Sequence, residues 1–207
     1  MEFVSFEKLY RTEFFLSEEL AKPQYWATRG NVYNALGKPK ISQTLLWFKN
    51  CSATITDSHG NVLEIAKNQL AYMAKGLEYI VQFHDTDPAR EDTVVIHFQM
   101  TDRQGRDISA AAFPMICVSN VDSSLALSFD LMVQECKNNI VCTPTLCAEL
   151  YKILALICQK QKRRITRDRF ACIRPGIQLL ERDSDLNLSQ IAAECGVSDC
   201  YFRRLSL

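Results

Sequence analysis

The last twenty residues constrain the fold of this chain most tightly, because they meet the requirements of two short helices joined by a glycine turn. Such a unit needs a small residue where the helices touch, a turn residue that can adopt positive φ, and apolar side chains between the helices. Ala192 and Gly196 meet the first two requirements. The apolar positions are Ile191, Cys195, Val197, Phe202 and Leu205. The segment 188–207 therefore predicts a helix-turn-helix.

Each of these helices also has its own start signal. Asn187 can cap the first helix, and Gln190 three residues later can close a capping box. Ser198 can cap the second helix, where Asp199 in the first turn interacts favourably with the helix dipole.

The segments 173–182 and 188–205 resemble the first helix-turn-helix of the AraC/XylS family of bacterial transcription regulators. Gly196-Val-Ser-Asp-Cys-Tyr-Phe-Arg-Arg204 carries the glycine, serine, Tyr-Phe pair and basic residue of the family at the family's separations. In that family a long helix and a second helix-turn-helix follow, whereas this sequence reads Ser206-Leu207. The resemblance therefore implies a DNA-binding domain truncated inside its first helix-turn-helix and weak in DNA binding.

A helix from Ser198 to Leu205 would enter the major groove with the side opposite Phe202 facing the bases. The resemblance then implies DNA contacts from Ser198, Cys200, Arg203 and Arg204. An arginine can donate two parallel hydrogen bonds to a guanine edge, but it can equally contact phosphate.

The net charge of zero conceals two halves of opposite sign. Residues 1–159 contain 14 Lys and Arg against 18 Asp and Glu, whereas residues 160–207 contain 10 against 6. This asymmetry predicts two modules, the second attracted to polyanions. The basic stretch 160–169 marks the border and is either a solvated linker or a phosphate contact.

The segment 44–117 predicts short strands joined by tight turns. Polar and apolar residues alternate from Ser52 to Thr56, and Asp57 to Asn61 predicts a hairpin turn. In a later strand, one face is formed by Val94, Ile96, Phe98 and Met100. The other face is formed by Val95, His97 and Gln99. Several short strands at this spacing favour a small antiparallel barrel or sandwich. The first 30 residues fit either helix or strand.

After Asp122 the period becomes helical, and a second amphipathic run opens at Thr143-Pro144. The apolar faces of these two helices either cover the barrel or form a dimer seam. The family resemblance favours dimerisation. The predicted fold class is thus α+β: a cupin-like antiparallel β-barrel (1–120), two connecting or dimerisation helices (121–162) and a partial all-α helix-turn-helix domain (163–207).

The same resemblance implies that the barrel senses a small effector such as a sugar, since a barrel interior can hold one small ligand. The polar and aromatic candidates to line it are Trp47, Tyr72, Tyr79, His97 and Gln99. For each of them an ordinary core or surface role is the alternative.

An enzyme is not predicted. The three histidines, His59, His84 and His97, include no His-x-His pair, and no cofactor motif is present. Nine cysteines without a Cys-x-x-Cys pair predict reduced thiols in a cytoplasmic protein, and a zinc site at Cys136, Cys142 and Cys147 has unsuitable spacing. The N-terminus fits neither a signal peptide nor a membrane span. The predicted function is a ligand-responsive, homodimeric transcription regulator; the alternative is a stand-alone cupin-like small-molecule-binding or dimerisation protein without DNA binding.

Overall fold

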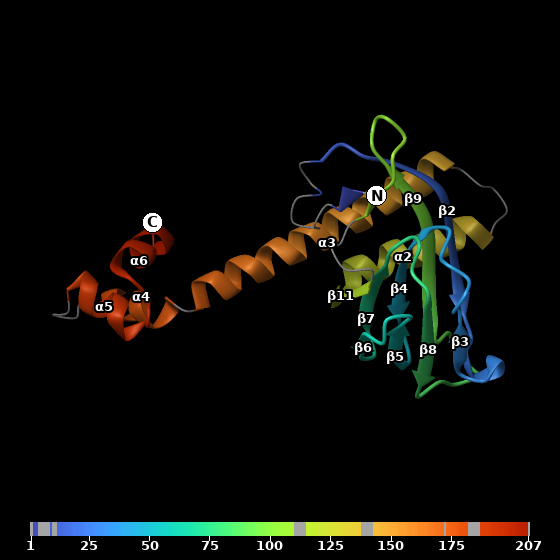
Figure 1. Ribbon diagram of the computed structural model, residues 1–207, viewed down its shortest axis with the longest axis horizontal. Coiled ribbons are helices and arrows are strands. Elements are labelled where there is room, and N and C mark those ends of the chain that lie inside the picture. The colour runs from blue at the N-terminus through green and yellow to red at the C-terminus, as the bar shows by residue number, and fades with distance from the viewer. Residues whose placement is uncertain are drawn as a thin grey trace. The chain divides into compact units, whose positions relative to one another are not determined.

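The computed structural model in Figure 1 describes residues 2–3, 9, 12–109, 115–137, 143–171, 173–181 and 187–206. The chain divides into two units, Met1–Gln159 and Lys160–Leu207. Strands occupy the N-terminal part and helices follow from residue 123 onward. The predicted α+β fold with an N-terminal antiparallel β-structure is therefore confirmed.

Two antiparallel sheets form the body of the first unit. The larger has the strand order β11-β7-β4-β9-β2, the smaller has the order β3-β8-β5-β6, and β1 pairs in parallel with β10. The strands are β1 (Glu2–Phe3), β2 (Phe15–Gln24), β3 (Val32–Asn34), β4 (Gln43–Phe48), β5 (Ser52–Asp57), β6 (Val62–Ile65), β7 (Gln69–Met73), β8 (Tyr79–His84), β9 (Thr93–Thr101), β10 (Ile108–Ser109) and β11 (Met115–Asn120). A 3-10 helix, η1 (Ala27–Arg29), connects β2 to β3.

The predicted hairpin between β5 and β6 is confirmed. Asp57 Oδ1 accepts the backbone N–H groups of His59 at 2.9 Å and Asn61 at 2.8 Å, which is how a short acidic side chain stabilises a turn. Within the first 30 residues, which the sequence left ambiguous between helix and strand, Phe15–Gln24 form β2, whereas Leu9 is helical. Pro23 is compatible with this strand because β2 lies at the edge of its sheet, where one side needs no ladder hydrogen bond.

Residues of β9 alternate between two hydrophobic cores, as the sequence predicts. Val94, Ile96 and Phe98 belong to the core between the larger sheet and the helices. Val95 points the other way and belongs to the core between the two sheets. This period of two places His97 on the inter-sheet side of β9.

The two helices predicted after Asp122 are α2 (Ser123–Lys137) and α3 (Thr143–Ala171), and α3 extends beyond the end of the first unit at Gln159. Their apolar stripes are buried in the same core as one face of the larger sheet. The buried apolar residues of α2 and α3 are Leu125, Phe129, Met132, Val133, Leu146, Leu150, Ile153, Leu154, Ile157 and Cys158. These stripes therefore cover the sheet within one chain. Helix α3 also continues through the basic stretch 160–169, which the sequence allowed to be either a solvated linker or a phosphate contact.

The second unit contains α4 (Arg174–Glu181), α5 (Leu188–Glu194) and α6 (Asp199–Ser206). Ile173, Ile191, Ala192 and Phe202 form its buried centre. A Cβ atom on Gly176 would lie 2.5 Å from Phe202 Cε2 and 2.7 Å from Cys195 Sγ. The absence of a side chain at this position therefore lets α4 pack directly against α5 and α6.

Candidate functional sites: a cationic cavity and an exposed basic helix

A cavity of about 180 Å³ opens between the two sheets of the first unit. Its walls come from the inward faces of β4, β7, β8 and β9, and from the segment that runs from β2 through η1 into β3. Leu46, Val81 and Val95 supply apolar wall. β2 and β3 are edge strands of different sheets, so no backbone hydrogen-bond ladder joins the two sheets on this side of the cavity. The chain between β2 and β3 bounds the cavity there.

Aromatic side chains form one end of the cavity. The rings of Trp26 and Phe83 stack with centroids 4.2 Å apart, and Tyr33 meets Trp26 edge-on at 5.7 Å. Trp26 is fixed further by its indole N–H, which donates to Thr93 Oγ1 at 3.0 Å. Its backbone N–H donates to the buried carboxylate of Asp92 at 2.6 Å. These contacts give the aromatic wall a defined position.

Three cations line the cavity: Lys22, Arg29 and Lys40. Arg29 lies over the Trp26 ring, 5.6 Å from its centroid, and the Lys40 ammonium lies 5.6 Å from the Tyr79 ring. Burial lowers the pKa of Lys40 from 10.5 to about 8. Within the ranges that the structure describes, no carboxylate forms an ion pair with any of the three.

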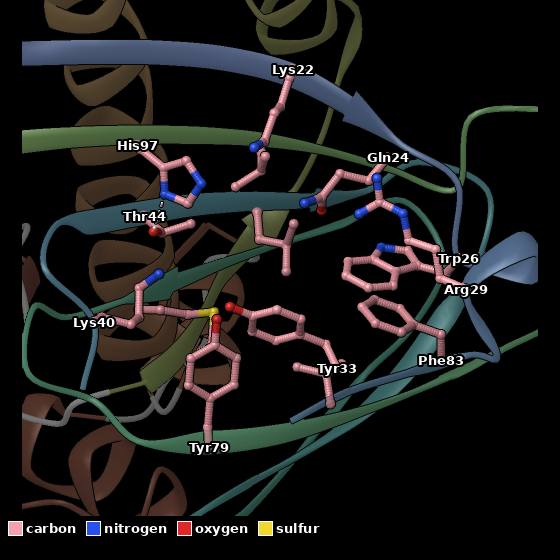
Figure 2. A pocket seen from close by; sticks show the side chains of 14 residues that line it. Lys22, Gln24, Trp26, Arg29, Tyr33, Lys40, Thr44, Tyr79, Phe83 and His97 are labelled. Atoms are coloured by element: carbon pink, nitrogen blue, oxygen red, sulfur yellow. Dashed lines mark hydrogen bonds between the residues drawn. The ribbon is translucent and has the colours of Figure 1, made fainter. Parts of the chain in front are cut away.

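His97 lies between two of these cations. Burial first, and then the charges of Lys40 and Lys22, lower its pKa from 6.5 to about 4, so the imidazole is neutral at pH 7. Its Nδ1 is hydrogen-bonded to Thr44 Oγ1 at 3.0 Å. Figure 2 shows the imidazole, Lys22 and Lys40 around one part of the cavity, with Arg29 beside Trp26 in another part. Burial, with a smaller contribution from Tyr33, also raises the pKa of Tyr79, which keeps its phenol protonated.

The five residues predicted to bind an effector occupy different places. Tyr79 and His97 line the cavity. Trp47 lies on the opposite face of β4, 5.7 Å from the Phe129 ring of α2. Tyr72 lies on the opposite face of β7, and its hydroxyl donates to Gln43 Oε1 at 2.6 Å. Gln99 is outside the cavity lining, and its Nε2 donates to the carbonyl of Ile41 at 2.9 Å.

Sequence reasoning missed much of the lining because it comes from the end of the first 30 residues, whose fold the sequence left ambiguous. Lys22 and Gln24 reach the cavity from β2, Trp26 from the N-cap position of η1, and Arg29 from η1. A usable signal was the alternation of Lys22, Gln24 and Trp26, which is the period of a strand with one polar face.

The helix-turn-helix geometry in the second unit follows the predicted capping and turn chemistry. Asn187 and Gln190 form both hydrogen bonds of the capping box, at 3.0 and 2.8 Å. Ser198 Oγ accepts the Tyr201 N–H at 3.2 Å, and Gly196 has a φ of +65° in the turn. These contacts fix where α5 and α6 begin.

Helix α6 buries one side and exposes the other. Phe202 is 0% exposed, whereas Ser198, Cys200, Arg203 and Arg204 are exposed. Arg203 donates through Nε and Nη2 to the two carboxylate oxygens of Asp199, each at 3.2 Å. The Arg204 guanidinium lies 5.2 Å from the centre of the Tyr201 ring. The exposed side of α6 is therefore basic and carries hydrogen-bond donors.

Two further observations concern metals and membranes. Within the described ranges, no three His, Cys, Asp or Glu side chains are grouped so that they could hold a metal ion. Of the cysteines weighed as zinc ligands, Cys136 Sγ accepts the Ala21 N–H at 3.3 Å, Cys147 Sγ donates to the carbonyl of Leu16 at 3.7 Å, and Cys142 lies outside the described residues. No helix in the described part of the chain has the length and apolar character needed to cross a membrane.

No family model matches the sequence, and no curated protein matches it. Among solved structures, unsaturated fatty acid-bound ToxT from Vibrio cholerae is similar with 10% identity and a TM-score of 0.35, over 93% of this chain and 90% of that chain. The AraC-like transcriptional activator CuxR has 12% identity and a TM-score of 0.34, over 93% and 68%. A protein described as a candidate mannose-6-phosphate isomerase from Ralstonia eutropha has 16% identity and a TM-score of 0.23, over 41% and 68%. Likenesses this weak carry no functional argument, so function is inferred from the chain's own residues.

Proposed function

We propose that this protein is a ligand-responsive transcription regulator: the first unit binds a small effector in its inter-sheet cavity, and the second unit binds DNA through α6. The observation that carries the proposal is the two-sidedness of α6. Phe202 is fully buried against α4 and α5, while Arg203 and Arg204 are exposed on a helix that a capped glycine turn positions. This is the arrangement in which a recognition helix presents side chains to the major groove.

The two arginines are not equivalent in the free protein. Arg203 is held by both oxygens of Asp199, so a DNA contact from it requires that ion pair to be exchanged or shared. Arg204 rests on a tyrosine ring, which leaves its donors directed to solvent. We therefore expect Arg204 to contribute more than Arg203 to DNA binding.

The cavity supports the effector half of the proposal. It combines aromatic walls with cations and a neutral imidazole, and small-molecule sites combine apolar lining with a few convergent polar groups in this way. For the ligand to regulate, its affinity must differ between the DNA-bound and DNA-free states of the protein. The expected readout is a change in DNA affinity when the cavity is occupied.

The test begins with duplexes that the whole protein selects from a random DNA library. Fluorescence anisotropy then gives the Kd of the best duplex for the wild type and for Arg204→Ala. Loss of a specific arginine contact costs about 1–3 kcal/mol, which corresponds to a Kd about 5- to 150-fold weaker. The slope of log Kd against log salt should also fall, because one cation fewer displaces counterions.

Lys67→Ala is the matched control, since it removes one exposed positive charge from the first unit. It is expected to leave the Kd nearly unchanged. The DNA-binding proposal is wrong if the library yields no preferred duplex, or if Arg204→Ala weakens binding no more than Lys67→Ala does. In that outcome the cavity would favour the alternative function, a small-molecule-binding protein without DNA binding.

A further inference from the structure

The charge of the cavity distinguishes between classes of ligand. Lys22, Arg29 and Lys40 contribute positive charge to the lining, and none of the described lining residues is acidic. Lys22 and Arg29 are exposed, whereas Lys40 is half-buried, and a neutral sugar would leave the Lys40 ammonium without a counter-charge. Charge complementarity therefore favours an anionic ligand over a neutral one.

The cations are divided between two places. Lys22 and Lys40 lie with His97 in one part of the cavity, as Figure 2 shows, and both cations lower the pKa of the imidazole. Arg29 belongs to a second place, where its guanidinium lies over the Trp26 ring. Figure 2 shows these two groups in different parts of the cavity. The lining also includes the apolar side chains of Leu46 and Val95.

We propose that the cavity binds a small dicarboxylate, with one carboxylate at Lys22, Lys40 and His97 and the other at Arg29. This inference rests on the proposed function in taking the cavity as the effector site. The planar guanidinium of Arg29 can donate two parallel hydrogen bonds to a carboxylate, and the lysines act as point charges. The hydrocarbon middle of the ligand lies against Leu46 and Val95.

The size of the cavity limits the ligand. A dry protein cavity of about 150 Å³ admits one benzene molecule. At about 180 Å³, the cavity fits a short aliphatic diacid or a single ring with two acidic groups, and it is too small for a long acyl chain.

Isothermal titration calorimetry of the whole protein tests this assignment. The diacids succinate, glutarate and adipate are compared with the monoacids butyrate, pentanoate and hexanoate and with the corresponding diamides. We expect at least one diacid to bind about tenfold or more tightly than the monoacid of its length, because a charge-assisted hydrogen bond contributes more than a neutral contact. The diamides should bind more weakly than the monoacids.

Two variants assign the two ends. Lys40→Met should weaken diacids and monoacids alike by about tenfold or more, since both use the lysine cluster. Arg29→Met should remove the advantage of the diacid over its monoacid. Lys38→Met is the matched control: Lys38 is exposed, lies outside the cavity lining and should leave all affinities unchanged.

The dicarboxylate assignment is overturned if no diacid binds better than its monoacid, or if Arg29→Met leaves the diacid advantage intact. It is also overturned if a neutral sugar binds and no diacid does. These outcomes are separate from failure of the proposed function. A diacid that binds without altering DNA affinity supports the ligand class and contradicts the regulatory coupling. A sugar that binds and alters DNA affinity contradicts the ligand class and supports the regulatory coupling.

Discussion

Lys40→Met is expected to make the ligand-free protein more stable at pH 7 while it removes part of the proposed ligand site. In the wild type a half-buried ammonium has no ion-pair partner among the described residues, and burial lowers its pKa to about 8. Methionine has a similar length and no charge to desolvate. A functional cation that costs stability is typical of a binding site.

The magnitude follows from the pKa difference between the unfolded and folded states. A fall in pKa from 10.5 to about 8, at about 1.4 kcal/mol for each pKa unit, gives an upper limit of about 3.5 kcal/mol for burying the charged form. Partial exposure to water reduces this cost, and the variant loses a cation–π contact with Tyr79 that contributes about 0.5–1 kcal/mol. We therefore expect a net gain of about 1–2 kcal/mol.

The stability advantage of Lys40→Met over the wild type keeps its sign but becomes smaller as the pH rises. Below about pH 8 the lysine is charged in both states, so the wild type carries the full penalty and the variant has its full advantage. Between about 8 and 10.5 the folded state loses the proton first, so the wild type becomes more stable as the pH rises. The advantage of Lys40→Met should therefore be large at pH 7 and small at pH 10.

Urea unfolding followed by tryptophan fluorescence measures this difference. Both tryptophans, Trp26 and Trp47, lie in the first unit, so the signal reports on the unit that contains Lys40. Lys38→Met, two residues away and exposed, is the control and should change the free energy of unfolding by less than about 0.5 kcal/mol. The reasoning is refuted if Lys40→Met destabilises the protein at pH 7, or if its effect is the same at pH 10.

Three further changes test the contacts that shape the two units. Asp92→Ala leaves the buried backbone N–H of Trp26 without its acceptor and should cost about 2–4 kcal/mol in urea unfolding; a cost below about 0.5 kcal/mol would contradict that role. Gly176→Ala places a methyl group 2.5 Å from Phe202 and should lower the free energy of unfolding of the second unit by about 1–3 kcal/mol. The helical circular dichroism should then be lost at a lower temperature, whereas unchanged thermal melting would show that the helices can move apart freely. Asn187→Ala removes the capping box and should lower the protection of the Gln190 amide from hydrogen exchange by about 1 kcal/mol, whereas equal protection would mean that the cap contributes nothing.

The features that the sequence predicted well depend on neighbours close in the chain. Asn187 and Gln190 are three residues apart, and the β5–β6 turn is closed by Asp57 and residues up to four positions later. The alternation along β9 is likewise a local property, because successive strand residues point to opposite faces. Local hydrogen-bonding chemistry and side-chain period were sufficient to predict these elements.

The cavity could not be predicted in this way, because its lining comes together only when distant strands pair. Trp47 and Tyr72 looked suitable by residue type, yet each is one position out of phase with a residue that lines the cavity, Leu46 or Met73. Which face of a strand meets the cavity depends on the sheet that packs against it, and the sequence of one strand does not contain that information.

The amino-acid sequence by itself determined the run of short strands between residues 44 and 117, the helices that follow Asp122, the turn chemistry, the caps and the buried side of α6, because each follows from residues within a few positions of one another. The tertiary structure decided that α2 and α3 cover the larger sheet, that Gly176 is where three helices meet, and that Lys22, Arg29 and Lys40 share one cavity. These facts depend on contacts between residues far apart in the chain. Only folding sets those distances, and with them the burial that shifts the pKa values of Lys40 and His97.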